Sequence, residues 1–229
     1  QTPAAKVDPT STPNAAATAA AISRATSTAE AGATATVQAQ ATAQAVATSE
    51  ALKSAVDALT KNKKKVGESF QGELEVREGS VVRRGWDTHL RDFMVEGTFF
   101  NPFDANDGPW DYGFMFRRTG SNEQYRLFVQ SDKDWSLRLA QSQNGGSSQE
   151  IASGSYEKLD TSEGGKNVLT LVCKESTAYF YINSDHVATL DVSQKTDAGE
   201  VAVATGFVSQ HKLPGTMIRY EGFELWALE

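Results

Sequence analysis

The sequence has one cysteine, no long apolar run and no excess of basic residues, and each lack excludes a class of protein. Cys173 alone cannot form an intrachain disulfide, and no Cys/His cluster is present that could hold a structural zinc ion. No apolar run approaches the roughly 20 residues of a membrane-spanning helix, so we expect no span. The net charge of −7 excludes nucleic acid as a partner, because phosphates require a basic surface.

Aromatic residues are absent from the first part of the chain. All 4 Trp, 6 Tyr and 11 Phe among the 229 residues lie beyond residue 66. A segment without bulky side chains cannot build a hydrophobic core of its own. We therefore predict one domain at 66–229 behind an appendage, which divides into an extended Pro/Thr/Ser leader at 1–14 and a helical Ala/Thr/Gln-rich segment at 15–65.

The leader carries Pro3, Pro9 and Pro13 among Thr and Ser residues, a composition typical of an extended chain. The sequence starts at Gln1 rather than Met, which predicts removal of an upstream secretion signal; a shortened chain would start the same way. We accordingly expect an extracellular or cell-surface location.

Alanine occupies every odd position from Ala29 to Ala47 except Val37. A period of two is typical of a strand, but an all-Ala face buries little area. Ala and Gln favour helix, and Ser27 with Glu30 matches a helix capping box. Helix is the preferred interpretation, and strand stays open for this stretch.

The end of the appendage has a clearer helical pattern. Leu52, Val56 and Leu59 fall on one helical face. Lysines within 61–65 then stand where a helix C-terminus favours positive charge, and Gly67 ends the run.

A helix that is polar or Ala-faced nearly all round is marginally stable alone, so its order must come from a partner. Copies of the same chain are the preferred partner; a solvated stalk and docking on the chain's own domain are the alternatives. The larger apolar residues of residues 1–65 would form the assembly surface: Val37, Val46, Leu52, Val56 and Leu59.

Residues 66–229 alternate between apolar and polar positions in many short runs, such as 93–99, 125–129 and 169–173. Turn sequences separate these runs at intervals of about 8–12 residues. This rhythm is typical of an all-β sandwich. Within the last run, the pattern shifts phase at Gly222, which predicts a β-bulge.

Three stretches resemble the concanavalin A-like (laminin-G-like) jelly-roll superfamily, over about residues 68–229. They are Trp110-Asp-Tyr-Gly-Phe-Met-Phe-Arg, Tyr179-Phe-Tyr-Ile-Asn, and Tyr220-Glu-Gly-Phe-Glu-Leu-Trp. The resemblance implies an antiparallel jelly roll of two sheets and, in many members, binding of carbohydrate or calcium. The Ala/Thr/Gln segment resembles low-complexity stalks of bacterial surface proteins.

The superfamily also includes glycoside hydrolases with a Glu-x-Asp-x-x-Glu strand. The nearest match here is Glu73, Glu75 and Glu78, but Glu78 has the opposite parity, and charged residues also suit an exposed edge strand. The histidines lie in separate turn contexts: His89, His186 and His211. We therefore predict that the chain is not an enzyme.

A calcium site is a further candidate. Asp104, Asn106, Asp107 and Asp111 gather the oxygen ligands that Ca²⁺ prefers. The spacing is one residue short of a calcium loop, and Asn-Asp-Gly is also an ordinary turn sequence. No other cofactor is expected.

The tryptophans Trp86, Trp110 and Trp135 are candidates for stacking on sugar rings, and core packing is the alternative for each. Four arginines add hydrogen-bond donors without a spacing that joins them: Arg83, Arg84, Arg117 and Arg118.

Two functions of different kinds follow. The preferred prediction is a non-catalytic extracellular structural protein, whose jelly-roll domain assembles through residues 1–65 into a cell-surface array or filament of identical subunits. The alternative is a stalked, lectin-like module that binds extracellular glycans. A glycoside hydrolase is a distant third.

Overall fold

The computed structural model describes residues 49–141, 148–208, 210 and 213–229. By compactness the chain divides into Gln1–Ser54 and Ala55–Glu229. The first unit is described only over 49–54, which are helical. The leader, the Ala-alternating stretch, Val37 and Val46 lie outside the described residues. No helix within the described ranges is long and apolar enough to cross a membrane.

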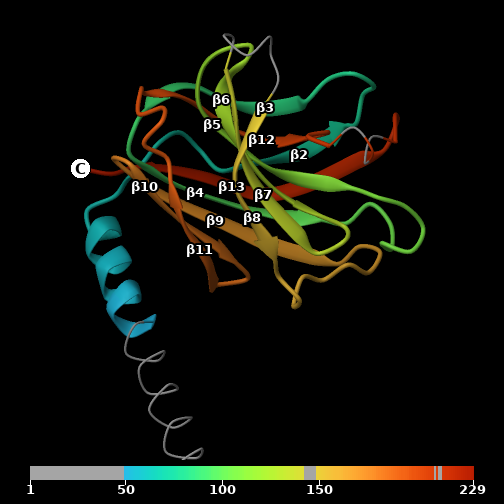
Figure 1. Cartoon of the computed structure of the whole chain (residues 1–229), viewed down its shortest axis with the longest axis horizontal. Helices are drawn as coiled ribbons and strands as arrows, with labels where there is room; N and C mark the ends of the chain where they lie inside the picture. The colour runs from blue at the N-terminus through green and yellow to red at the C-terminus, as the bar shows by residue number, and fades with distance from the viewer. Residues whose placement is uncertain (1–48, 142–147, 209, 211–212) are drawn as a thin grey trace, which may run out of the picture. The chain divides into compact units, whose positions relative to one another are not determined.

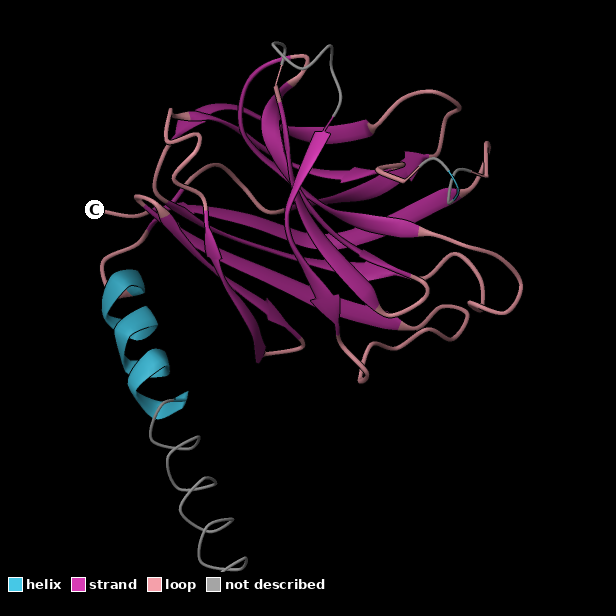
Figure 2. Cartoon of the chain, viewed as in Figure 1, coloured by secondary structure: helices cyan, strands magenta, loops and turns pink. Residues whose placement is uncertain are grey.

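The second unit is an antiparallel sandwich of two sheets, which confirms the predicted all-β jelly roll (Figures 1 and 2). Sheet A has the order β1 (Lys64–Lys65), β13 (Met217–Ala227), β4 (Phe93–Phe100), β9 (Lys166–Lys174), β10 (Thr177–Ile182), β11 (Asp185–Asp191), and β2 (Phe70–Glu75) also pairs with β13. Sheet B has the order β3 (Val82–Leu90), β12 (Gly199–Thr205), β5 (Asp111–Gly120), β6 (Glu123–Gln130), β7 (Asp134–Ala140), β8 (Ser148–Ser155).

Alternation within the strands builds the core between the sheets. On β4, Phe93, Val95, Gly97 and Phe99 are buried, while the residues that alternate with them are partly buried. On β5, Phe114 and Phe116 meet this layer from sheet B. Each apolar face is buried against the other sheet, and this burial is the main favourable term for folding.

The bulge predicted at Gly222 is confirmed. The pairing of β13 with β2 shifts register between Tyr220 and Phe223, and Gly222 adopts a φ of 57°. A left-handed conformation favours glycine because it has no Cβ. The bulge keeps Tyr220 and Phe223 both in the core despite their odd spacing.

A buried arginine ties three connecting segments together, those between β3 and β4, β9 and β10, and β11 and β12. Arg117 is fully buried, and its guanidinium donates to the carbonyl oxygens of Arg91, Glu175, Val192 and Lys195. From the sequence we grouped Arg117 with three other arginines as hydrogen-bond donors near the candidate sugar-binding residues, but its guanidinium makes these bonds inside the protein. A buried guanidinium needs such partners, because an unpaired one would cost several kcal/mol.

The helix of residues 49–60 ends earlier than predicted, and its last part belongs to the sandwich unit. Val56 is 8% exposed and packs against Val172 and Leu228. Leu52 and Leu59 are partly buried. Val56 therefore lies against the chain's own domain, which is the docking alternative, and is not free for contact with another copy.

The predicted helix to residue 65 is wrong at its end. Lys64 and Lys65 form β1, whose backbone pairs with Trp226 and Ala227 of β13. Lys65 also forms an ion pair with Glu224 at 2.8 Å. Pairing with the sheet edge here prevails over the weak preference of lysine for a helix end.

Asp92 provides a test of electrostatic stability. Burial raises the pKa of its carboxyl, but the Glu175 N–H and the cations of Arg91 and Lys174 outweigh burial and hold the pKa below the ordinary 3.8. A carboxyl whose pKa is lowered on folding stabilises the fold above pH 3.8, and this stabilisation is lost as the pH falls through the folded pKa.

We expect Asp92→Asn to lower the free energy of unfolding at pH 7 by about 1–3 kcal/mol. The gap from the wild type should narrow below pH 4, measured by urea denaturation between pH 7 and pH 2.5. Asp87→Asn, at an exposed position of β3, is the control and should change stability by less than about 0.5 kcal/mol. An Asp92→Asn gap as wide at pH 2.5 as at pH 7 would contradict this account.

Candidate functional site

The outer face of sheet B carries the polar residues that alternate with its core residues. On β6, Tyr125 and Leu127 point into the core, so Arg126 and its neighbours of the same parity point outward. Cross-strand pairing places a row of residues in register from β8 to β3, named here the central row: Glu150, Arg138, Arg126, Met115, Ala202 and Gly85.

A buried carboxylate fixes the segment that covers the middle of this face. Asp111 Oδ1 accepts hydrogen bonds from the N–H groups of Gly206 at 2.7 Å and Phe207 at 3.1 Å, and Oδ2 accepts one from Val208 at 2.9 Å. Thr205 Oγ1 also donates to the Asp111 carbonyl. Bonds to an ionised acceptor are about twice as strong as neutral ones, so residues 206–208 are held firmly.

The fixed segment places Phe207 on Phe128. The two rings are stacked with centroids 4.8 Å apart, and Phe128 is fully buried although it points outward from β6. The Arg138 guanidinium lies 5.9 Å from the Phe128 ring. Phe207 also lines one of the two hollows of this face.

The first hollow, named the arginine hollow, has a volume of about 420 Å³. Its charged and polar lining includes Arg83, Arg118, Gln124 and Arg126, and its apolar lining includes Met115, Val81 and Phe207. Glu200 forms ion pairs with both Arg83 and Arg118. The structure thus joins two of the arginines that the sequence left unconnected.

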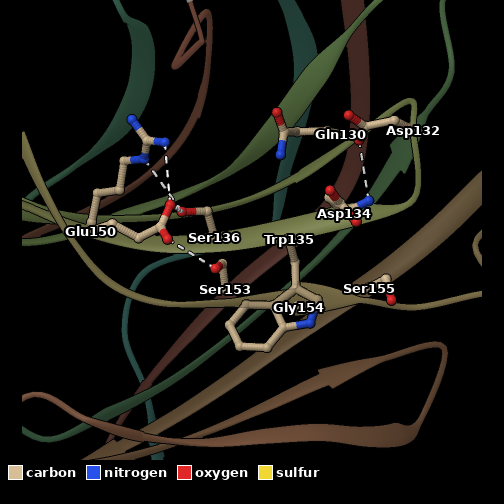
Figure 3. Close-up of a pocket in the computed structure, with 10 residues that line it drawn as sticks. Gln130, Asp132, Asp134, Trp135, Ser136, Glu150, Ser153, Gly154 and Ser155 are labelled. Carbon is tan, nitrogen blue, oxygen red and sulfur yellow. Dashed lines mark hydrogen bonds and ion pairs between the residues drawn. The ribbon is translucent and has the colours of Figure 1, made fainter.

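The second hollow, named the serine hollow, has a volume of about 410 Å³ (Figure 3). Glu150 accepts hydrogen bonds from Ser136, Arg138 and Ser153 on its two carboxylate oxygens. The remaining lining is mostly polar: Gln130, Asp132, Asp134, Trp135, Gly154 and Ser155. Both hollows are therefore lined mainly by hydrogen-bond donors and acceptors rather than by apolar side chains.

Two buried polar atoms at the arginine hollow lack a hydrogen-bond partner among the described residues. Gln124 is 1% exposed, and its Oε1 has no hydrogen-bond partner among the described residues. Arg126 Nε is likewise buried without a partner in the described ranges. Most buried polar groups in proteins are hydrogen-bonded, so these two atoms call for an explanation.

The predicted tryptophans lie mainly in the core. Trp110 is 1% exposed, and its Nε1 donates to the Phe103 carbonyl at 3.2 Å. Trp86 packs against the same core while partly exposed. Trp135 is 7% exposed and contributes to the lining of the serine hollow, but its ring lies against Gly154 and packs in the core against Phe180, with centroids 5.9 Å apart (Figure 3). Of the three, only Trp135 lines one of the two hollows named above.

Two of the predicted calcium ligands, Asp104 and Asp111, already accept hydrogen bonds within the protein. Asp104 Oδ1 accepts from the N–H and the side-chain amide of Asn106, as in an ordinary turn. Asp111 instead caps residues 206–208. No group of three or more His, Cys, Asp or Glu residues in the described part of the chain could hold a metal ion. The calcium prediction for Asp104, Asn106, Asp107 and Asp111 therefore gains no support.

The other candidates for catalysis are dispersed. Glu73 and Glu75 are exposed on β2, and Glu78 lies in the turn after it. His89 lies on β3 and His186 on β11, in different sheets, and His211 lies outside the described residues. Burial raises the pKa of the Cys173 thiol to about 12, so this cysteine is not an activated nucleophile.

The sequence did not single out Gln124, Arg126, Glu150 or Phe207. The sequence did contain one signal for the arginines. In the two consecutive strand-like runs that became β6 and β7, Arg126 and Arg138 occupy polar positions that alternate with core residues. A hairpin between those runs would have placed the two arginines side by side. The role of Phe207 depends on the Asp111 cap, which joins segments far apart in the sequence.

Comparisons with known proteins support the fold. No protein-family model matches the sequence, and no curated protein matches it. A solved structure from A. japonicus described as CB05 superposes with a TM-score of 0.55 and 15% identity, over 75% of this chain and 27% of that chain. The fructosyltransferase of A. japonicus gives a TM-score of 0.53 and 16% identity over the same shares. The chain thus spans about a quarter of those two proteins.

A carbohydrate binding module from Bacillus subtilis, CBM66, superposes with a TM-score of 0.46 and 14% identity, over 70% of this chain and 92% of that chain. Identities this low show a shared fold alone. The two A. japonicus matches support a jelly-roll-like β-sandwich, while the narrower concanavalin A-like resemblance and the low-complexity stalk stay predictions.

The prediction that the chain is not an enzyme is contradicted by these comparisons. It followed from the lack of a recognisable catalytic set, yet the matching solved chains include a fructosyltransferase. A sandwich of this kind thus occurs within an enzyme chain, so the fold does not separate this protein from enzymes.

The Asp111 cap can be tested directly. We expect Asp111→Ala to lower the free energy of unfolding by about 3 kcal/mol, because it leaves three backbone N–H groups without their charged acceptor. Amide hydrogen exchange at 206–208 should accelerate at the same time. Asp132→Ala removes one exposed acceptor and should cost less than about 1 kcal/mol. Unchanged exchange at 206–208 in Asp111→Ala would refute the role of the cap.

Proposed function

We propose that the chain is a carbohydrate-binding β-sandwich that holds its ligand on the outer face of sheet B. The central row and its two hollows carry this proposal. Sugars present hydroxyl groups that donate and accept hydrogen bonds, together with apolar C–H faces. Guanidinium, carboxylate, serine hydroxyl and apolar groups therefore suit them when they lie together on one rigid surface.

The sizes of the hollows fit such a ligand. Volumes of about 420 and 410 Å³ lie within the range of ligand pockets, about 300–1,000 Å³. The side chains project from β5, β6, β7 and β8, whose pairing fixes their spacing. A surface built on strands needs little reordering when it binds, which lowers the cost of association.

The fold comparison gives secondary support. A fructosyltransferase, by its name a protein that handles a sugar group, contains a sandwich of the same fold. The structural filament, the preferred prediction from the sequence, has less support, because Val56 packs on the chain's own domain. The extracellular location expected from the sequence suits a glycan-binding protein and belongs to the same proposal.

The test is a broad glycan array with variants that fill each hollow. Ser153→Trp would fill the serine hollow from β8, and Ser121→Trp would fill the arginine hollow from the turn between β5 and β6. We expect the wild type to bind a defined set of glycans and at least one variant to lose that binding tenfold or more.

The matched control is Thr189→Trp, at an exposed position of β11, the edge strand of the other sheet. It adds the same bulk away from both hollows and should bind as the wild type does. Wild-type protein that binds no glycan, or two hollow-filling variants that bind normally, would reject the proposal.

A further inference from the structure

The arginine hollow carries an uncompensated positive charge. It is lined by the guanidinium groups of Arg83, Arg118 and Arg126. The Glu200 carboxylate is shared by Arg83 and Arg118, whereas Arg126 forms no ion pair within the described residues. An ionised group that is partly buried without a counter-charge lowers stability, so its presence suggests a ligand that supplies one.

The surroundings of Arg126 strengthen this imbalance. Its cross-strand neighbours are Met115, which is neutral, and Arg138, which is positive. Burial, together with repulsion from Arg138, lowers the pKa of Arg126 from its ordinary value. An arginine nevertheless remains protonated in a protein, so the charge persists. Glu150 forms its ion pair with Arg138, on the side of Arg138 away from Arg126, so within the described ranges it does not neutralise Arg126.

Gln124 Oε1, a hydrogen-bond acceptor without a partner among the described residues, lies near the Arg126 Nε–H donor, which also lacks one. Gln124 and Arg126 stand on the same face of β6, two residues or about 7 Å apart. Gln124 Oε1 needs an O–H or N–H donor, whereas Arg126 Nε needs an acceptor. A saccharide that carries an anionic oxygen and a hydroxyl group about one sugar ring apart would satisfy both atoms.

We propose that the arginine hollow binds an acidic saccharide, whose carboxylate or sulfate group pairs with Arg126 and whose hydroxyl group donates to Gln124 Oε1. This inference rests on the proposed carbohydrate-binding function and specifies its ligand class. Arg126 Nε and a terminal nitrogen can together grip two oxygens of one anionic group, the strong bidentate arrangement of arginine.

A bare anion fits this site less well than a sugar acid. It would satisfy Arg126 but leave the buried Gln124 oxygen without a donor. Met115 and Phe207 add an apolar wall that suits the C–H groups of a sugar ring. The net charge of −7 also opposes general attraction of polyanions, so recognition depends on the short-range pairing in the hollow.

Calorimetric titration with two matched pairs of probes tests this inference. The first pair is a galacturonate oligosaccharide and its methyl ester. The second is a sulfated galactan oligosaccharide and its desulfated form. We expect the wild type to bind the charged member of at least one pair tenfold or more tightly than its neutral counterpart. The pair that shows the preference identifies carboxylate or sulfate as the anionic group.

Arg126→Gln should reduce this preference to less than twofold, and Arg126→Lys, which keeps the charge but not the planar fork, should lose most of it. Gln124→Met should weaken the charged and neutral members alike, because it removes only the acceptor for a hydroxyl group. Arg77→Gln, an exposed arginine beyond β2, should retain the wild-type preference. Arg126→Gln removes an uncompensated cation, so its thermal unfolding midpoint should equal or exceed that of the wild type.

The failures are distinguishable. Wild-type protein that binds neutral and charged members equally would overturn the acidic ligand and leave carbohydrate binding in place. A preference that survives in a folded Arg126→Gln variant would overturn this site. Wild-type protein that binds none of the four probes and no glycan on the array would overturn both the inference and the proposed function.

Discussion

The surface on which the proposed function depends is organised by the carboxylate of Asp111. Three consecutive N–H groups converge on it and turn residues 206–208 over sheet B. Phe207 is thereby held on Phe128, so the middle of the face is covered and a hollow remains on each side. Because the cap is buried and charged, this arrangement is rigid before any ligand arrives.

The two faces of sheet B have different roles: the inner face stabilises the fold, and the outer face carries the proposed binding site. Its inward side chains are large aromatic and aliphatic groups that fill the core. Its outward side chains are free of this packing constraint, and they include Arg126, whose Nε is buried without a hydrogen-bond partner among the described residues. Sites commonly retain such groups because their ligand supplies the missing partner.

The fold was predictable because alternation is local. In runs such as 93–99 the alternation of apolar and polar residues predicts which side chains are buried. The change of phase at Gly222 likewise predicts a bulge without reference to any other strand. The site was not predictable in the same way. Arg83, Arg118 and Arg126 come from β3, β5 and β6, and only the strand order brings them to one hollow.

The predictions of sugar stacking by the tryptophans and of a helix end at the lysines were wrong or unsupported for related reasons. The apolar ring of Trp110 suits contact with a sugar and packing in a core equally. In the structure it is buried, and its Nε1 donates to the Phe103 carbonyl. Lys64 and Lys65 suit a helix end by charge, but the free edge of β13 offered backbone hydrogen bonds. In each case a contact distant in sequence prevailed over a local preference.

Side-chain resonances give the most direct test that the outer face of sheet B is the binding surface. Isotope-labelled protein would be titrated with the tightest glycan from the array and followed by NMR, including the Arg126 Nε–H and Gln124 amide signals. The account predicts that these signals shift together with the backbone of β5 to β8, while the outer face of sheet A stays unchanged. Shifts confined to sheet A or to the connecting loops away from both hollows would contradict it.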